Sequence, residues 1–294
     1  MQNRKQRQNP QPEIAYHLYP TLLDSYTDYL SSDEIYSKYW GNSENPPHTF
    51  EEFEQKQFQG LIDKINRVPF DSEACDRGTC LNEIVDCLIE HRRSEIMDIR
   101  KVYEVKVIGQ VDNCDPDERF AEVEYTDKVI GLEADYKGRT FFFDINLCRE
   151  FANYYKGALT QQFVSAILPT MFGNVRLYGY VDELMPLCVH DIKTTKSYSV
   201  GNYKKHWQHH CYLYCLEQMG MFIPMFEYNI AQIDKSGRWQ TFTESYNYRP
   251  EETKRLLVEH CESLIRFLED NKSLITDTKI APIWHRETID AHNS

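Results

Sequence analysis

An aspartate and a lysine stand two residues apart in a stretch whose pattern predicts paired β-strands. Residues 175–184 and 187–194 alternate apolar and polar side chains on either side of Met185–Pro186, which is typical of a β-hairpin. Successive strand side chains point to opposite faces, so Asp191 and Lys193 share one face of the second strand. This shared face is where chemistry is expected.

A second carboxylate faces this pair across the predicted hairpin. If the turn comprises the four residues Met185 to Cys188, Asp182 lies directly opposite Asp191, with Cβ atoms roughly 5 Å apart. Two carboxylates at that distance repel one another unless a cation lies between them. Mg²⁺ and Mn²⁺ prefer oxygen ligands, and Lys193 could orient or deprotonate a water molecule beside such an ion.

A polar loop and a predicted helix over residues 203–219 follow the hairpin. Lys204, Gln208 and Tyr212 recur at intervals of four residues, so they are expected on one face of this helix. A carboxylate pair, a lysine and a Gln/Tyr helix face that converge on one site suggest phosphodiester chemistry.

These residues form three motifs in sequence order: Gly179-x-x-Asp182, Asp191-x-Lys193 and Gln208-x-x-x-Tyr212. They resemble the RecB-like branch of the PD-(D/E)XK nuclease superfamily, which has G-x-x-D, D-x-K and Q-x-x-x-Y in the same order on a strand, a strand and a helix. The resemblance implies an α/β fold whose central mixed β-sheet is flanked by helices.

The resemblance also implies roles for individual residues. The ligands of Mg²⁺ or Mn²⁺ would be Asp182, Asp191 and the main-chain carbonyl of Ile192. Lys193 would position the attacking water and stabilise the developing negative charge. Gln208 and Tyr212 would orient the substrate strand or the region around Lys193. The phosphates of the substrate would be contacted by Lys196, Lys204 and Lys205.

An upstream helix could supply a further metal ligand. Residues 75–93 carry an apolar stripe at helical spacing. A helix of the RecB-like branch resembles G-T-x-x-H-x-x-x-E, and this sequence has Gly78 and Thr79, with Asn82 in place of the histidine and Asp86 in place of the glutamate. An ordinary solvated helix face is an equal alternative. The acids that could serve the metal from a helix are Asp86, Glu83 and, ranked below them, Glu150.

Cysteines and histidines also gather around the motifs, among them Cys188, His190, Cys211 and Cys215. Zinc is conceivable, but the sequence has no C-x-x-C pair of the kind that structural zinc sites often use. Packing of the thiols as small apolar groups is the favoured interpretation. An iron–sulfur cluster, which some RecB-like nucleases carry, is not expected because Cys261 is the only cysteine after Cys215.

Composition and charge narrow the class of protein. The 294 residues are 41% hydrophobic and 13% aromatic, which predicts a globular chain. There is no apolar run of membrane-spanning length, no signal-peptide pattern, and an odd number of scattered cysteines, so a reducing, cytoplasmic location is expected. The net charge of −13 argues against a nonspecific DNA coat protein, although four lysines stand against one acid from His190 to His206.

The expected organisation is a mobile tail at residues 1–13, a helical N-terminal elaboration at 14–72, a nuclease domain at 73–275 and a C-terminal tail at 276–294. Strands between residues 101 and 145 could extend the central sheet or form a side hairpin. A helix is expected over residues 147–168, ending before Pro169.

The sequence thus predicts a metal-dependent nuclease that hydrolyses DNA phosphodiester bonds. The resemblance favours an exonuclease of recombination or repair, of phage or bacterial type, with a recombination protein as a potential partner; an endonuclease and RNA as substrate stay open. The alternative is a non-catalytic protein that binds DNA or a protein partner through the same fold. The departure at Asn82 favours that alternative, whereas the intact Asp182, Asp191 and Lys193 set disfavours it. A third class, a zinc hydrolase that uses the histidines, would be indifferent to loss of Asp191.

Overall fold

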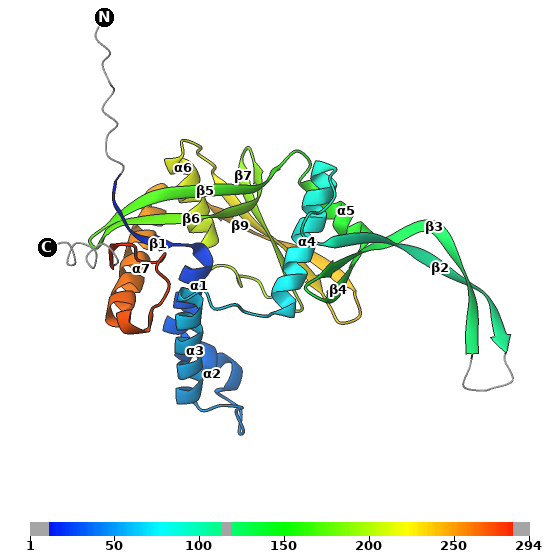
Figure 1. Cartoon of the computed structure of the whole chain (residues 1–294), viewed down its shortest axis with the longest axis horizontal. Helices are drawn as coiled ribbons and strands as arrows, with labels where there is room; N and C mark the ends of the chain where they lie inside the picture. Colours follow the sequence, from blue (N-terminus) through cyan, green and yellow to red (C-terminus); the bar gives the residue numbers. More distant parts are fainter. Residues whose placement is uncertain (1–11, 113–118, 285–294) are drawn as a thin grey trace, which may run out of the picture.

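The computed structural model describes residues 12–112 and 119–284 and shows a mixed α/β fold (Figure 1). Its central sheet is mixed, with strand order β1-β6-β7-β8-β9 and with β5 paired to β6. The strands of this sheet are β1 (Ile14–Leu18), β5 (Leu159–Thr170), β6 (Gly173–Met185), β7 (Cys188–Thr195), β8 (Met225–Ile233) and β9 (Trp239–Asn247). A second sheet contains β2 (Asp98–Asp112), β3 (Arg119–Tyr136) and β4 (Arg139–Asp144).

Helices cover both faces of the central sheet, as predicted. The larger apolar core joins one face to α1 (Pro20–Leu30), α3 (Phe50–Ile65), α6 (Gln208–Gln218) and α7 (Pro250–Asp270). The smaller core joins the other face to α4 (Glu73–Glu90) and α5 (Ile145–Tyr154). The remaining helices are α2 (Ser32–Trp40) and the short 3₁₀ helix Lys272–Leu274. Within the described ranges, no helix combines the length and the apolar character needed to cross a membrane.

The predicted hairpin and its register are confirmed. Met185 pairs with Cys188 across a two-residue turn, and the ladder continues to Glu183 opposite His190. Beyond that pair β6 and β7 separate: β7 pairs with β8 in parallel along its whole length, whereas β6 continues beside β5 and β1. Alternation along β7 sends Val189 into the larger core and Ile192 into the smaller one.

The prediction of one helix over residues 147–168 is wrong. α5 ends at Tyr154, Gly157 turns the chain with a φ of +85°, and β5 then runs antiparallel to β6. The buried side chains Val164, Ala166 and Leu168 recur every second residue, which is a strand period. The apolar residues of this segment fit a helical period as well as a strand period, so pairing with β6 decides that the segment is a strand.

Both ends of the described chain are more integrated than predicted. Residues 14–72 are not wholly helical, because β1 joins the central sheet in parallel to β6. The expected C-terminal tail is folded in its described part, since Ile280 and Ala281 are fully buried and the Ile280 carbonyl accepts a 2.9 Å hydrogen bond from His17 N. Most of the expected N-terminal tail and residues 285–294 lie outside the described residues.

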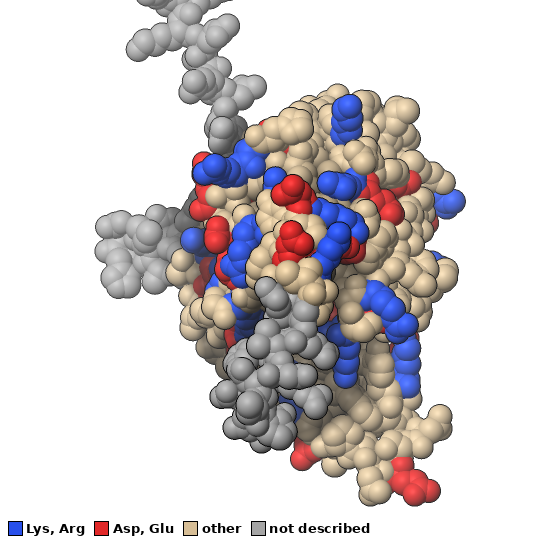
Figure 2. All heavy atoms as spheres, turned by 90° about the vertical axis from the view of Figure 1, so that its right-hand side faces the viewer, with Lys and Arg blue, Asp and Glu red and all other residues tan. Residues whose placement is uncertain are grey.

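The strands expected between residues 101 and 145 form a separate sheet rather than an extension of the central one. β2 and β3 make a long antiparallel ribbon that projects from the body (Figure 1), and β4 pairs only with the base of β3. Arg100 pairs with Glu133 and Asp135, and Lys128 pairs with Glu104 at 2.7 Å. Figure 2 shows basic and acidic side chains interspersed on the face from which the ribbon projects.

Candidate active site

Asp182 and Asp191 lie at the point where β6 and β7 separate. They would form the next pair of the ladder, but the Asp182 carboxylate instead accepts a hydrogen bond from Ile192 N, at 3.1 Å from Oδ2. Asp191 is only 2% exposed. The strand separation thus creates room for two carboxylates at the centre of the sheet, where an intact ladder would have placed backbone hydrogen bonds.

Lys193 is paired with Asp191 on the same strand face. Its Nζ lies 2.7 Å from Asp191 Oδ2 and 5.8 Å from the centroid of the Tyr228 ring. Burial lowers the pKa of Lys193, but the charges of Asp191 and Asp182 outweigh burial and raise it overall. The lysine is therefore a cation at neutral pH, which suits charge stabilisation better than proton abstraction.

The start of α6 holds Asp191 from the other side. Gln208 Nε2 donates to Asp191 Oδ1 at 2.5 Å. One turn later the Tyr212 ring lies against Gly179, where an added Cβ would be only 2.6 Å from Cε1 of the ring. The glycine of G-x-x-D and the tyrosine of Q-x-x-x-Y are thus explained by one close contact between β6 and α6.

The predicted helix begins later than expected, and this changes the position of Lys204. α6 starts at Gln208, preceded by a turn in which Lys204 N donates to the Gly201 carbonyl. Trp207 N donates to Asp24 Oδ1 at 2.7 Å and fixes the entry to the helix. The prediction that Lys204, Gln208 and Tyr212 share one helical face is therefore wrong for Lys204.

The upstream helix does reach the site. Gly78 lies against β7, where an added Cβ would make an ordinary 3.4 Å contact with Thr194 Oγ1, so α4 packs closely on β7 at this point. One turn further, Asn82 Nδ2 donates to Asp182 Oδ2 at 3.0 Å. Asn82 therefore contacts the carboxylate pair directly. The alternative that these residues form an ordinary solvated helix face is wrong for this side of α4.

Asp86 and Glu183 form a second buried acidic pair beside Asp182. Glu183 is fully buried and Asp86 is 1% exposed. Burial and the neighbouring Asp86 raise the pKa of Glu183 to about 10, and burial raises the pKa of Asp86 to about 6. No described N–H or hydroxyl group donates to the Glu183 oxygens, and the two carboxyls interact through a hydrogen bond, so the pair retains a proton at neutral pH.

Gln161, which the sequence placed on a helix, stands on β5 at this acidic pair. The β5–β6 ladder pairs Thr160 with Glu183 and Gln162 with Val181 but skips Gln161 and Asp182. Gln161 has a φ of +48°, which is unusual for a residue with a side chain and marks a strained position. Its side chain acts on Asp86 by favouring the charged carboxylate. Sequence periodicity held no signal for this conformation.

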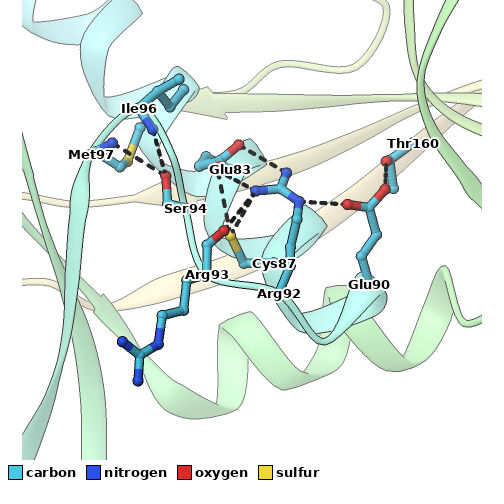
Figure 3. Close-up of polar contacts among 9 residues, drawn as sticks. All are labelled: Glu83, Cys87, Glu90, Arg92, Arg93, Ser94, Ile96, Met97 and Thr160. Atoms are coloured by element: carbon cyan, nitrogen blue, oxygen red, sulfur yellow. Dashed lines mark hydrogen bonds and ion pairs between the residues drawn. The ribbon is translucent and has the colours of Figure 1, made fainter.

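Glu83 is not placed at the site. Arg92 holds both of its carboxylate oxygens, at 2.6 and 3.2 Å, beyond the end of α4 (Figure 3). Glu150 is also elsewhere, because it accepts a hydrogen bond from Thr241 Oγ1. Of the three helical acids considered, the structure brings only Asp86 next to the carboxylate pair.

The donor set fits a hard divalent cation. Burial and the neighbouring Asp191 raise the pKa of Asp182 to about 7, so the site is costly to ionise without a cation. Three buried oxygens around it accept no hydrogen bond from the described residues, Asn82 Oδ1, Asp86 Oδ1 and Gln208 Oε1, and Asp191 Oδ2 is paired with the Lys193 ammonium. Buried acceptors are normally satisfied, and oxygen-only ligation is what Mg²⁺ and Mn²⁺ prefer.

The three lysines expected at phosphates are exposed. Lys205 pairs with Glu34 at 2.7 Å, and Lys204 and Lys205 line a cavity of about 350 Å³ between α1, α2 and the loop before α6. Lys196 follows the end of β7 and is exposed. They remain available to a ligand, but none contacts the carboxylate pair.

The cysteines and histidines near the motifs separate into two sets. Cys211 and Cys215 are buried in the larger core. Cys188 and His190 lie on the opposite face of β7 from Asp191 and come together with Glu227 of β8. The sequence reasoning missed Glu227, because its alignment with His190 depends on the β7–β8 register.

Comparison of the sequence with known protein families and with curated proteins gives no match. Function is therefore inferred from the geometry of this site and from the resemblance of its three motifs.

Proposed function

We propose that the protein is a metal-dependent nuclease that hydrolyses DNA phosphodiester bonds through a PD-(D/E)XK-type core. The observation that carries the proposal is the convergence of Asp182, Asp191 and Lys193 with Asn82 of α4 and Gln208 of α6. These residues come from four separate elements. Burying two carboxylates and a lysine together is costly, so the stability of the fold alone does not call for this set of side chains. The motif resemblance favours an exonuclease of recombination or repair.

The residues that would hold Mg²⁺ or Mn²⁺ are Asp182, Asp191, Asp86 and the main-chain carbonyl of Ile192. When bound, such an ion supplies a Lewis acid that polarises a phosphoryl oxygen and acidifies a bound water. Asn82 and Gln208 keep one oxygen each of Asp182 and Asp191 in place, so they act as positioning residues.

Lys193 contributes a fixed positive charge. Its Nζ lies 2.7 Å from Asp191 Oδ2 and its side chain is 25% exposed, so it would orient a water and donate to a phosphate oxygen as negative charge develops. Tyr212 packs against Gly179 and supports β6 behind Asp182. Gln208 and Tyr212 would therefore support the carboxylates and β6, whereas the resemblance implied that they orient the substrate strand or the region around Lys193.

The proposal is tested by incubating the full chain with linear and with covalently closed DNA, in Mg²⁺ or Mn²⁺. Degradation of linear DNA alone is expected and identifies an exonuclease. Cutting of both forms would identify an endonuclease with the same site. Absence of cleavage of DNA and RNA under either metal would contradict the proposal and favour a binding protein.

A further inference from the structure

A cluster on the face of β7 opposite Asp191 and Lys193 is not used by the proposed nuclease site. It consists of Cys188 and His190 on β7 and Glu227 on β8, and we call it the Cys188–His190–Glu227 cluster. Cys188 and His190 are two residues apart and share one face, and Glu227 is the partner of His190 in the parallel ladder. Asp191 and Lys193 point the other way, toward Tyr228 and α6.

The three side chains present one ligand atom each to a common point. Cys188 Sγ, His190 Nδ1 and a Glu227 oxygen lie within 4.8 Å of one another. His190 Nδ1 is 3.3 Å from Glu227 Oε2 and 4.0 Å from Cys188 Sγ. Tetrahedral zinc bonds would separate N from O by about 3.4 Å and S from N by about 3.6 Å. The N–O separation already matches this geometry, and Cys188 Sγ would have to move closer to His190 Nδ1 by about 0.4 Å.

The cluster is buried and supported. Cys188, His190 and Glu227 are 6%, 3% and 9% exposed. Tyr154 OH donates to Glu227 Oε2 at 2.8 Å, and Ser245 Oγ lies 3.2 Å from Oε1, so the carboxylate is held from two directions. Outer hydrogen bonds of this kind orient the ligands of metal sites. The rings of Tyr154 and Tyr155 each make a T-shaped contact with the His190 ring.

A fourth ligand is also at hand. Asn229 Oδ1 lies 3.1 Å from His190 Nδ1, and Tyr154 and Asn229 border a cavity of about 490 Å³. The fourth position of a tetrahedral ion can therefore be taken by the Asn229 amide oxygen or by a water from this cavity. If Nδ1 of His190 carries the ring hydrogen, that hydrogen faces Cys188 Sγ, Glu227 Oε2 and Asn229 Oδ1 at once. Glu227 Oε2 and Asn229 Oδ1 also accept hydrogen bonds from the hydroxyls of Tyr154 and Tyr155.

We infer that the Cys188–His190–Glu227 cluster binds one zinc-class transition-metal ion that ties β7 to β8. A thiol, an imidazole and a carboxylate suit zinc, whereas a hard ion such as Mg²⁺ avoids sulfur. The sequence alone favoured packing of the thiols as apolar groups. Glu227 completes the ligand set, and its place beside His190 depends on the β7–β8 register, which local sequence spacing does not predict. Because β7 also carries Asp191 and Lys193, the ion would stabilise the strand on which the proposed catalysis depends.

The test measures metal content in the full chain, purified without a metal-affinity step and dialysed free of loose ions. About one zinc per chain is expected in the wild type, with loss in Cys188→Ser and in His190→Gln. Two control variants should retain zinc: Cys215→Ser, which alters a buried cysteine of the larger core, and Asp191→Asn. Zinc that is lost in Asp191→Asn but kept in Cys188→Ser would place the ion at the nuclease site and overturn the inference.

A second measurement needs no variant. Chelator-treated wild type titrated with Co²⁺ should gain the near-ultraviolet absorption of a cobalt–thiolate bond, and Zn²⁺ should then abolish it. Zinc, but not Mg²⁺, should also raise the melting temperature of the chelated protein. A wild type that purifies without zinc and shows no cobalt–thiolate band would overturn the inference, even if the variants fail to fold.

Discussion

The side-chain amide of Asn82 donates a 3.0 Å hydrogen bond to Asp182 across 100 residues of sequence. This contact joins α4 to the strand that carries one of the two facing carboxylates. It also shows how the departure from the histidine of the RecB-like pattern is accommodated, because an amide can hold the carboxylate and still present its own oxygen. That oxygen has no donor among the described residues.

Replacing Asn82 by alanine should lower nuclease activity about 10- to 100-fold while the fold persists. The reason is that Asp182 would lose the donor that fixes one of its oxygens. Activity and the Mg²⁺ concentration for half-maximal rate should be measured together. A lower rate at saturating metal with no change in metal dependence would show that Asn82 does not position a metal ligand.

Asp86→Asn and Glu83→Gln should behave differently although the two acids are three residues apart. Asp86→Asn should lose at least about tenfold in activity, because Asp86 lies beside Asp182 and Glu183. Glu83→Gln should keep activity and lose about 1 kcal/mol of stability or less, since it only weakens the partly exposed pair with Arg92. Parallel cleavage assays and thermal melts check both, and loss of activity in Glu83→Gln alone would reverse the assignment.

Gly179→Ala should destabilise the protein by about 1–3 kcal/mol, because the new Cβ would collide with the buried Tyr212 ring. Its melting temperature should fall by roughly 2–4 °C for each kcal/mol. The matched control is Gly60→Ala on α3, where a Cβ meets nothing within 4 Å. That substitution should be neutral or stabilising by about 0.5–1 kcal/mol. Equal effects of the two substitutions would argue against the Gly179–Tyr212 contact.

Glu183→Gln should make the metal-free protein more stable at alkaline pH. Burial raises the pKa of Glu183 to about 10, so the folded state keeps a proton that the unfolded state releases above its ordinary pKa of 4.5. The wild type therefore loses stability as pH rises from about 4.5 toward 10, whereas glutamine has no proton to lose. Thermal melts of both proteins from pH 5 to 9 should diverge. Parallel curves would show that Glu183 is ionised in the fold.

Local spacing was enough to predict the hairpin and the shared face of Asp191 and Lys193. Both depend on the two-residue period of a strand and on a short turn, which act within a few residues. The position of Asp182 opposite Asp191 followed from the same register.

Long-range pairing set the features that local spacing missed. Residues 159–168 satisfy a helical pattern as well as a strand pattern, and only pairing with β6 makes them β5. The left-handed Gln161, the Asp86–Glu183 pair and the alignment of Glu227 with His190 all arise where different elements meet. The residue pattern within a single helix or strand does not predict such contacts between elements.

The most direct test of the central claim compares cleavage of linear DNA by the wild type, Lys193→Ala and Lys196→Ala under saturating Mn²⁺ or Mg²⁺. Lys193 is paired with Asp191 in the site, whereas Lys196 is an exposed lysine three residues later. We predict that Lys193→Ala loses about 100- to 1,000-fold in rate and that Lys196→Ala loses far less. Full activity in Lys193→Ala, with its fold intact, would contradict the proposed site.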